Sequence, residues 1–274
     1  MGSLRVSGRP RRARALTIAG SDSGGGAGIQ ADLKTFSALG VYGMTAITAV
    51  TVQDTLGVRR AETIDPSVVA EQIQVVAADI GVDAAKTGML ATAAIVEAVA
   101  RAVAEAGVAP LVVDPVAVSK HGDPLLAADA LDALRTRILP LATLVTPNLP
   151  EAAALSGQEV LSREQMRRAA AAIADLGAKA VLVKGGHLAE REPAADLFVE
   201  GGREEWLEQD RIATPHTHGT GCTLSAAIAA HLAKGATLRD AVVAGKVFVT
   251  QAIRASLAIG AGIGPVDQLW PIDP

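Results

Sequence analysis

The residues best suited to chemistry form one short run, Gly219-Thr220-Gly221-Cys222, ahead of an apolar helical pattern at residues 224–232. Glycines at a helix start leave backbone N–H groups able to converge on an anion, and the helix dipole adds partial positive charge. Such a site can hold the charge that develops on a transferring phosphoryl group. A thiolate at Cys222 would be stabilised in the first helical turn. The local sequence fits equally well a flexible turn that enters a helix, with Cys222 as a small buried side chain.

Two histidines, His216 and His218, lie just before this run and, with Cys222, offer an alternative interpretation as metal ligands. A zinc site needs a fourth ligand or an open position for water. No clear fourth ligand accompanies the three residues, so the metal interpretation is the less favoured one.

A second glycine-rich segment covers residues 21–28 and follows a predicted strand. Such a loop lets a ligand approach the backbone closely. Residues 26–31 also fit the loose dinucleotide pattern G-x-G-x-x-A, but they lie several residues past the strand instead of in a tight turn directly after it. A mobile loop without a ligand is the third interpretation.

Polar residues follow several predicted strands. The Asn-Leu-Pro-Glu segment at 148–151 places an amide and a carboxylate where they could organise Mg²⁺ near nucleotide phosphates. The same residues form a capping-box pattern with Pro in the first helical turn, and the pattern alone favours the cap. Asp114 and Lys184 end other strands and are candidates for metal or phosphate contacts. No P-loop motif occurs, so a nucleotide must be held in another way.

Short β-rich runs alternate with longer amphipathic stretches along the chain. We predict strands at residues 15–19, 44–52, 58–64, 84–87, 110–114, 142–146, 180–184, 194–199 and 204–209. We predict helices at residues 29–38, 66–79, 91–106, 124–136, 149–156, 163–176, 221–233 and 238–257. This alternation predicts an α/β fold with a mostly parallel sheet covered on both faces, and ligands of such sheets bind beyond the carboxyl ends of the strands. Because no linker or repeat interrupts the pattern, we predict one domain over residues 15–274.

Composition narrows the class of protein. The chain has 274 residues, half of them hydrophobic, and a net charge of −4 with both signs interspersed, which favours neither a nucleic-acid nor a membrane partner. No apolar run is long enough to span a bilayer. The single cysteine excludes an intramolecular disulfide and suits a reducing compartment such as the cytoplasm. Residues 1–14 carry five Arg and no acid, and we predict a disordered or loosely attached extension, with a transit peptide as the alternative.

Long, ordered motifs then connect the chain to a known family. They are residues 15–51, 86–90 (KTGML), 113–115, 119–125, 146–151 (TPNLPE), 183–187 (VKGGH) and 217–226 (THGTGCTLSA). In these motifs the chain resembles the hydroxymethylpyrimidine/phosphomethylpyrimidine kinase family of the ribokinase-like superfamily, over about residues 15–257. The resemblance implies a three-layer α/β/α fold and usually a homodimer.

The resemblance also implies a reaction, the ATP-dependent phosphorylation of 4-amino-5-hydroxymethyl-2-methylpyrimidine and then of its monophosphate, for thiamine synthesis. By matching position, the pyrimidine is expected to contact Gly20, Asp32 and Gln53, with Met89 on the apolar wall. A Gln amide suits a ring that offers both an acceptor nitrogen and an amino donor. Thr51 stands where relatives often carry an aliphatic side chain, and only its backbone is expected to matter.

On the nucleotide side, the resemblance implies that three residues organise Mg²⁺: Asp114, Asn148 and Glu151. Segments expected to line the ATP site contain Thr146, Lys184, Thr214 and Lys246.

The catalytic base is the point at which this family differs from most ribokinase-like sugar kinases. Those enzymes carry Asp at the end of the glycine motif, whereas this family and this chain carry Cys, at Cys222. A thiolate could accept the proton of the substrate alcohol. The second phosphorylation needs no base, because the attacking oxygen already belongs to an anionic phosphate.

Three other functions remain open on the sequence. A pyridoxal kinase is the nearest, since relatives with the same Cys motif accept that ring. A nicotinamide-dependent oxidoreductase would follow from the glycine loop, against which the absence of a tight turn argues. A non-catalytic pyrimidine sensor on a kinase fold is the third, against which the retained Cys222, Asn148, Glu151 and Lys184 argue.

Overall fold

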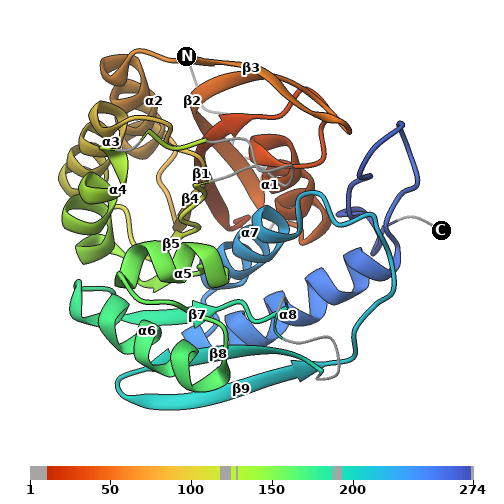
Figure 1. Ribbon diagram of the computed structural model, residues 1–274. Helices are drawn as coiled ribbons and strands as arrows, with labels where there is room; N and C mark the ends of the chain where they lie inside the picture. Colours follow the sequence, from red (N-terminus) through yellow and green to blue (C-terminus); the bar gives the residue numbers. More distant parts are fainter. Residues whose placement is uncertain (1–10, 118–124, 128, 187, 189–192, 273–274) are drawn as a thin grey trace.

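A nine-stranded sheet runs through the protein in the order β3-β2-β1-β4-β5-β6-β7-β8-β9 (Figure 1). The computed structural model describes residues 11–117, 125–127, 129–186, 188 and 193–272. The strands are β1 (Arg14–Ser21), β2 (Tyr42–Asp54), β3 (Gly57–Thr63), β4 (Ala84–Thr87), β5 (Leu111–Val113), β6 (Leu144–Val145), β7 (Ala180–Val183), β8 (Ala194–Glu200) and β9 (Arg203–Gln209). Strands β2, β1, β4, β5, β6 and β7 pair in parallel, and antiparallel strands flank them. The predicted mostly parallel sheet is confirmed.

Helices cover both faces of the sheet. They are α1 (Gly28–Ala38), α2 (Pro66–Asp79), α3 (Ala93–Glu105), α4 (Ala130–Ala133), α5 (Leu149–Ser156), α6 (Arg163–Asp175), α7 (Thr220–Ala233) and α8 (Leu238–Arg254). Helices α2 to α6 share one apolar core with the sheet, and α1, α7 and α8 share the other. This confirms the expected three-layer α/β/α fold. None of the helices in the described part of the chain is long and apolar enough to cross a membrane.

Strand β1 shows how one sheet separates two cores. Successive side chains of a strand point to opposite faces. Leu16 and Ile18 therefore pack under α2 to α6, whereas Ala15 packs under α1, α7 and α8, and all three are fully buried. A strand buried on both faces reads as a continuous apolar run, as the sequence of this segment does.

The helix predicted at residues 124–136 is the largest error in the sequence prediction. Helix α4 begins only at Ala130, and the chain continues as a π-helical turn over Leu134–Ile138 and a 3₁₀ turn over Leu139–Leu141. Pro140 lacks the N–H that an α-helix would need, so the hydrogen-bond pattern changes on approach to it. Residues 118–124 and 128, which include parts of the predicted loop and helix, lie outside the described residues.

The ordered chain begins before residue 15. Strand β1 starts at Arg14, whose Nη2 lies 2.7 Å from Asp83 Oδ1, and Arg11 Nη2 lies 3.1 Å from the same oxygen. The predicted boundary of the extension therefore moves from residue 15 to Arg14, where β1 begins, and the loose attachment of the residues before it stays a prediction. Residues 1–10 lie outside the described part of the chain.

Two irregularities interrupt the sheet beside the carboxyl end of β1. The pairing of β1 with β2 shifts between Ala19 and Ser21, at Gly20, and the pairing of β2 with β3 shifts between Val52 and Gln53. Bulges of this kind bend a strand and re-aim its side chains, and they are frequent next to active sites. Both fall at residues that the sequence predicts to contact the substrate.

Helices α7 and α8 approach closely because Gly245 has no side chain. A Cβ at Gly245 would lie 2.6 Å from Ile228 Cγ1 and 3.3 Å from the Ile228 backbone nitrogen. Since α7 begins at the glycine run, this contact helps to fix the helix that carries the candidate site.

We predict that Gly245→Val destabilises the protein by about 1–3 kcal/mol, because the added side chain overpacks this contact. Urea unfolding monitored by circular dichroism measures the change. Val247→Ala is the control on the same helix, since Val247 is 49% exposed, and it is expected to change stability by less than about 0.5 kcal/mol. Equal stabilities of the two variants would contradict the packing argument.

Candidate active site

Four residues from separate elements converge beyond the carboxyl ends of the strands, and we call them the phosphate-end cluster: Asp114, Glu151, Lys184 and Gly221. Lys184 Nζ lies 3.0 Å from Asp114 Oδ1 and 3.8 Å from Glu151 Oε2. A Cβ at Gly221 would lie 3.3 Å from Lys184 Nζ and 3.4 Å from Asp114 Oδ2. The first turn of α7 thus faces a buried cation and two carboxylates, and its N–H groups have no preceding helical turn to bond.

The cluster is electrostatically unusual because it is buried. Burial alone would lower the pKa of Lys184, but Asp114 and Glu151 outweigh it and raise that pKa, so the ammonium stays charged. Burial raises the pKa of Glu151 to about 7, and Asp114 adds to the rise, against the opposing effects of Lys184 and the Asn148 N–H. Glu151 therefore changes its charge near neutral pH.

The capping box predicted at Asn148 is confirmed. Asn148 Oδ1 accepts from the Glu151 N–H at 2.9 Å, and Glu151 Oε2 accepts from the Asn148 N–H at 2.8 Å. Pro150 lies in the first turn of α5, as expected. The box fixes the Glu151 carboxylate toward Lys184, so one local motif both starts a helix and positions an acidic group.

The phosphate-end cluster offers the kind of ligands that Mg²⁺ takes from a protein. The two carboxylates of Asp114 and Glu151 meet at a single ammonium group, that of Lys184. Within the described ranges no three His, Cys, Asp or Glu side chains gather as a complete metal site. Magnesium characteristically binds one or two carboxylates and takes its other ligands from water and substrate phosphates. The residues present fit that kind of site.

The four residues predicted to line the ATP site lie at three separate places. Thr146 and Lys184 lie at Asp114, with Thr146 Oγ1 3.4 Å from Asp114 Oδ1. Lys246 Nζ instead lies 2.5 Å from Asp196 Oδ2. The Oδ1 atom of Asp196 accepts from the N–H of Gly185, so Lys246 supports the turn that follows Lys184.

Thr214 lies at a separate contact. Its Oγ1 is 2.9 Å from Ser256 Oγ, just beyond the end of α8. The described contacts thus place Thr214 outside the phosphate-end cluster, and its role toward ATP stays a prediction.

Cys222 lies partly exposed in the first turn of α7, and its sulfur accepts a hydrogen bond from the Gly28 N–H. Burial raises the pKa of the thiol to about 11; the Lys86 charge lowers it, while Asp32 and Asp114 raise it further. Burial and the two carboxylates therefore outweigh the Lys86 ammonium and favour the protonated thiol, and a thiolate at Cys222 stays a prediction.

Lys86 and Asp32 form a fully buried ion pair beneath Cys222. Lys86 Nζ lies 3.0 and 3.2 Å from the two carboxylate oxygens, and Thr17 Oγ1 donates to Asp32 Oδ2 at 2.6 Å. Burial opposes the charge of Lys86, but Asp32, Cys222 and Asp114 raise its pKa to about 12. With both oxygens occupied, a direct contact of Asp32 with a pyrimidine stays a prediction.

Gly20 and Met89, both predicted to contact the substrate, lie against each other. A Cβ at Gly20 would meet Met89 Cε, the flexible end of the methionine, so a side chain there would displace the predicted apolar wall. Ala91, two residues after Met89, has a φ of 64°, which is rare for a residue with a side chain and is characteristic of functional turns. A strained turn therefore holds the predicted apolar wall.

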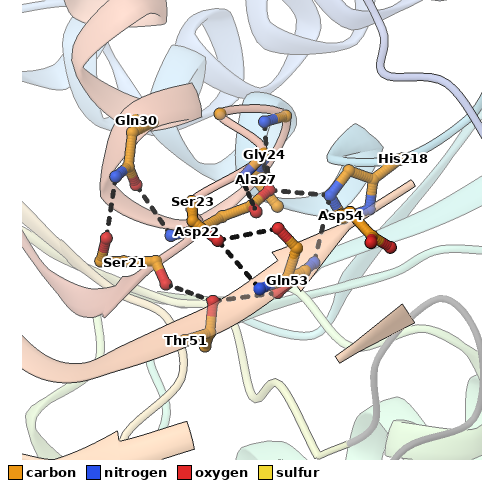
Figure 2. Close-up of polar contacts among 12 residues, drawn as sticks. Ser21, Asp22, Ser23, Gly24, Ala27, Gln30, Thr51, Gln53, Asp54 and His218 are labelled. Carbon is orange, nitrogen blue, oxygen red and sulfur yellow. Dashed lines mark hydrogen bonds and ion pairs between the residues drawn. The ribbon is translucent and has the colours of Figure 1, made fainter. Parts of the chain in front are cut away.

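The carboxylate of Asp22 organises the glycine-rich loop (Figure 2). Its oxygens accept from the N–H groups of Gly24 at 2.8 Å, Gly26 at 3.0 Å and Ala27 at 2.8 Å, and from His218 Nε2 at 2.9 Å. Burial alone would raise the pKa of Asp22, but His218 and the backbone donors hold it below its usual value. A loop with this many bonds to one side chain is not a mobile connection.

The loop glycines are explained by contacts within the chain. A Cβ at Gly26 would lie 2.6 Å from His218 Cδ2 and 2.8 Å from Pro265 Cβ, and one at Gly219 would collide with the Gly26 carbonyl oxygen. The Gly26 position of the dinucleotide pattern is therefore filled by the protein itself, whereas a ligand that approaches the rest of the loop stays a prediction.

The metal interpretation of the two histidines is not supported. His218 Nε2 is bonded to Asp22, and His216 Nδ1 accepts from the N–H of Gly264 at 3.1 Å. In the described part of the chain, no three His, Cys, Asp or Glu side chains lie together as a metal site. The rings serve instead to join segments of the chain.

The sequence prediction missed the segment after α8. His218 pairs with it through the Gly264 carbonyl at 3.1 Å and the Val266 N–H at 3.0 Å. Gln268 Nε2 donates to the Gly26 carbonyl and to Thr223 Oγ1, both at 3.2 Å. The alternating glycines at 260, 262 and 264, followed by Pro265, were the available signal for a close-packed turn.

Lys86 and Thr51 were also underestimated. Lys86 lies within the short buried strand β4, and a Lys in such a position was a signal that a partner charge would be needed. Thr51 Oγ1 donates to the Ser21 carbonyl at 2.8 Å and lies 3.3 Å from a terminal atom of the Gln53 amide. The expectation that only the backbone of Thr51 matters is therefore wrong.

The fold and the site together define a small-molecule kinase. At one end of the site, the glycine-rich start of α7 faces the ammonium group of Lys184 and two carboxylates. From Cys222 the site continues through Gly28 and Gly20 to Met89.

Comparison with known proteins gives the family. The sequence profile of the phosphomethylpyrimidine kinase family matches residues 22–267. The chain is 54% identical over 257 residues to a hydroxymethylpyrimidine/phosphomethylpyrimidine kinase of Streptomyces coelicolor, covering 94% of each chain. The chain belongs to the phosphomethylpyrimidine kinase family. Two of its motifs, at 119–125 and 183–187, extend into residues that lie outside the described part of the structure, namely 119–124 and His187.

Solved structures agree with this membership. The ADP complex of a Bacillus subtilis pyridoxal kinase is 43% identical with a TM-score of 0.89, covering 96% of this chain and all of that one. A phosphomethylpyrimidine kinase of Clostridium difficile is 41% identical with a TM-score of 0.79, covering 88% of this chain and all of that one.

We predict that the stability difference between Glu151→Gln and the native protein depends on pH. Because the pKa of Glu151 is raised in the folded protein, its protonated carboxyl group contributes to the free energy of unfolding. This contribution is fully present below about pH 4.5, the ordinary pKa, and is lost as the pH rises through about 7. The amide that replaces the carboxyl group in the variant does not titrate, so the variant gains stability relative to the native protein between about pH 5 and pH 8. Urea unfolding at a series of pH values measures this. A difference that stays constant over the range would show that Glu151 is ionised throughout.

Proposed function

We propose that the protein is an ATP-dependent kinase that phosphorylates 4-amino-5-hydroxymethyl-2-methylpyrimidine and then its monophosphate, for thiamine synthesis. The observation that carries the proposal is that a charged, anion-binding region and an apolar region lie next to each other in one site. Lys184, Asp114 and the start of α7 form an anion end, and Gly20 and Met89 form an apolar end near Cys222. The family membership and the name of the Streptomyces coelicolor relative support the same substrate.

At the phosphate end, the N–H groups at the start of α7 and the Lys184 ammonium would offset the charge on the transferring phosphoryl group. Asp114, Asn148 and Glu151 would hold Mg²⁺ and its waters, and the ion would supply further charge compensation for the ATP phosphates. Gly219, Thr220 and Gly221 would position the anion site. Thr146, Thr214 and Lys246 would support or line the nucleotide side.

At the substrate end, Gly20, Gln53 and Met89 would receive the ring, and the buried Lys86–Asp32 pair would form the floor beneath Cys222. The single domain over residues 15–274 would therefore contain both binding sites. A cytoplasmic location is proposed with it, since the partly exposed thiol of Cys222 suits a reducing compartment.

One assay decides between the candidate functions. Phosphoryl transfer from Mg-ATP is measured with the pyrimidine alcohol, its monophosphate and pyridoxal, side by side. Turnover of the two pyrimidines in preference to pyridoxal is expected. Faster turnover of pyridoxal would favour a pyridoxal kinase, the alternative supported by the Bacillus subtilis structure. No turnover of any of the three would favour a non-catalytic sensor.

Cys222 is proposed as the base of the first phosphorylation. With a pKa of about 11, the thiol must lose its proton before it can accept one from the alcohol, and Lys86 is the neighbouring charge that makes this easier. The first step should therefore speed up as the pH rises toward that value, about tenfold per unit while thiolate is scarce. The second step, in which a phosphate oxygen attacks, should lack this dependence.

We predict that Cys222→Ala slows the first phosphorylation at least about tenfold more than the second, because only the first needs a base. Cys222→Ser is the matched control, since it keeps the shape of the side chain but is a far weaker acid. It should not restore the first step. Steady-state rates on the alcohol and on the monophosphate measure both. Equal losses in the two steps, or rescue by Ser, would leave Cys222 only a packing or anion-site role.

A homodimer is also proposed, through the outer face of β2 and β3. Large apolar side chains lie exposed there, among them Val50 at 46%, Val52 at 51% and Leu56 at 60%. Exposed apolar groups gathered on an edge of a sheet are typical of an interface.

We predict a dimer mass by light scattering and a shift toward monomer in Val52→Glu, because a charge at the interface would lose its water on association. Val75→Glu on α2 is the control, since Val75 is 60% exposed and lies outside this face. A monomeric native protein, or equal behaviour of the two variants, would contradict the proposed interface.

A further inference from the structure

The imidazole of His218 lies between the glycine-rich loop and the end of β2 (Figure 2). Its Nε2 is 2.9 Å from Asp22 Oδ2 and 3.3 Å from a terminal atom of the Gln53 amide. The backbone of His218 is fixed on both sides by Gly264 and Val266, and the side chain is 10% exposed. The ring is therefore held in place by elements that are independent of any ligand.

The hydrogen on this ring can be assigned from its partner. Burial alone would raise the pKa of Asp22, but His218 and the N–H groups of Ala27 and Gly24 lower it, so the carboxyl is ionised at neutral pH. An ionised carboxylate only accepts hydrogen bonds. At 2.9 Å from Asp22, the Nε2 atom of His218 must then carry the hydrogen and direct it at Asp22.

The same reasoning assigns the Gln53 amide. Figure 2 draws Gln53 Nε2 3.3 Å from His218 Nε2 and Gln53 Oε1 3.3 Å from Thr51 Oγ1, but the oxygen and nitrogen of a carboxamide are assigned from the hydrogen bonds of their partners. Thr51 has one hydroxyl hydrogen, which it donates to the Ser21 carbonyl at 2.8 Å, so it can only accept from Gln53. His218 presents an N–H, so the atom facing it must not be a donor.

We propose that His218 is a positioning residue that holds the Gln53 amide with its oxygen toward His218 and its nitrogen toward Thr51, and thereby sets the preference of the site for its ring. Oxygen and nitrogen of a carboxamide are distinguished by their partners, and both partners here require the same orientation. This inference rests on the proposed function, in which Gln53 faces the substrate ring.

The fixed orientation has a consequence for ligand chemistry. After these two contacts, the Gln53 amide has one N–H and one oxygen lone pair available to a ligand. Their relative positions are fixed because the amide cannot turn. A ring with an acceptor nitrogen beside an amino group can satisfy both at once in a single orientation. Pyridoxal has no amino group beside its ring nitrogen and can satisfy only one of them. His218, one residue before the anion-binding turn, would thus act on ring selection at the other end of the site.

The test compares two variants of His218. In His218→Phe the ring shape stays and the N–H is lost, so the Gln53 amide can turn. In His218→Gln the side-chain amide nitrogen can replace Nε2 and still donate to Asp22. His231→Phe is the matched control, a histidine near the far end of α7 that contacts neither Asp22 nor Gln53.

Binding of the pyrimidine alcohol and of pyridoxal is measured by calorimetry, and KM and kcat are measured for both and for Mg-ATP. His218→Phe is expected to reduce the preference for the pyrimidine about tenfold, through its dissociation constant and KM, with the KM for Mg-ATP within about threefold of native. His218→Gln and His231→Phe are expected to keep the preference within about threefold of native. Melting temperatures of all variants report on folding.

The outcomes separate the two proposals. An unchanged preference in His218→Phe, or equal loss of both rings, would overturn the role of His218, because a merely structural effect acts on both rings alike. If His218→Phe does not fold, Thr51→Val replaces it in the test, because this change removes the other partner of Gln53. Loss of the preference for the pyrimidine is then the expected result. Native protein that binds the pyrimidine selectively without phosphorylating it would overturn the proposed function and leave the His218 proposal standing. Native protein that binds pyridoxal more tightly would overturn both.

Discussion

The carboxylate of Asp22 is the constraint on which the arrangement of the site depends. It collects three N–H groups of its own loop and one from His218, 196 residues further along the chain. A buried carboxylate with hydrogen bonds to its charged form is stabilised in that form, and each donor is in turn fixed by it. The loop after β1 and the turn before α7 therefore cannot move separately. The residues predicted for the two ends of the site are thus linked through one carboxylate.

Close contact at this junction is possible only with glycine. Gly26 lies against His218 and Pro265, and Gly219 lies against the carbonyl of Gly26 with a φ of 82°. A side chain at either position would push the two loops apart. Gly26 and Gly219, whose motifs suggest a phosphate or dinucleotide site, thus allow the two loops to pack directly against each other. Gly221 is the glycine that lies against the charged side chains of the phosphate-end cluster, those of Lys184 and Asp114.

Buried charges give the site its chemistry and cost stability. Lys86 and Asp32 are fully buried, and Lys184 is 16% exposed against an almost fully buried Asp114. Ion pairs in such positions seldom add net stability, because desolvation offsets much of the attraction. Their effect here is on neighbouring groups. The charge of Lys86 lowers the pKa of the Cys222 thiol against the larger effect of burial, and Asp114 helps to raise the pKa of Glu151.

The sequence by itself determined the alternation of strands and helices, the capping box at Asn148 and the position of Asp114 and Lys184 at strand ends, because these follow from local periodicity and from the rule that parallel strands end at one edge. It mispredicted the helix near Pro140 and the ends of several elements, where neighbouring turns compete. Only the tertiary structure decided the protonation of Cys222, the pairing of Lys86 with Asp32 and the contacts of His218 with Asp22 and Gln53. Burial and partners across the chain set those properties, and neither can be read from residues adjacent in sequence.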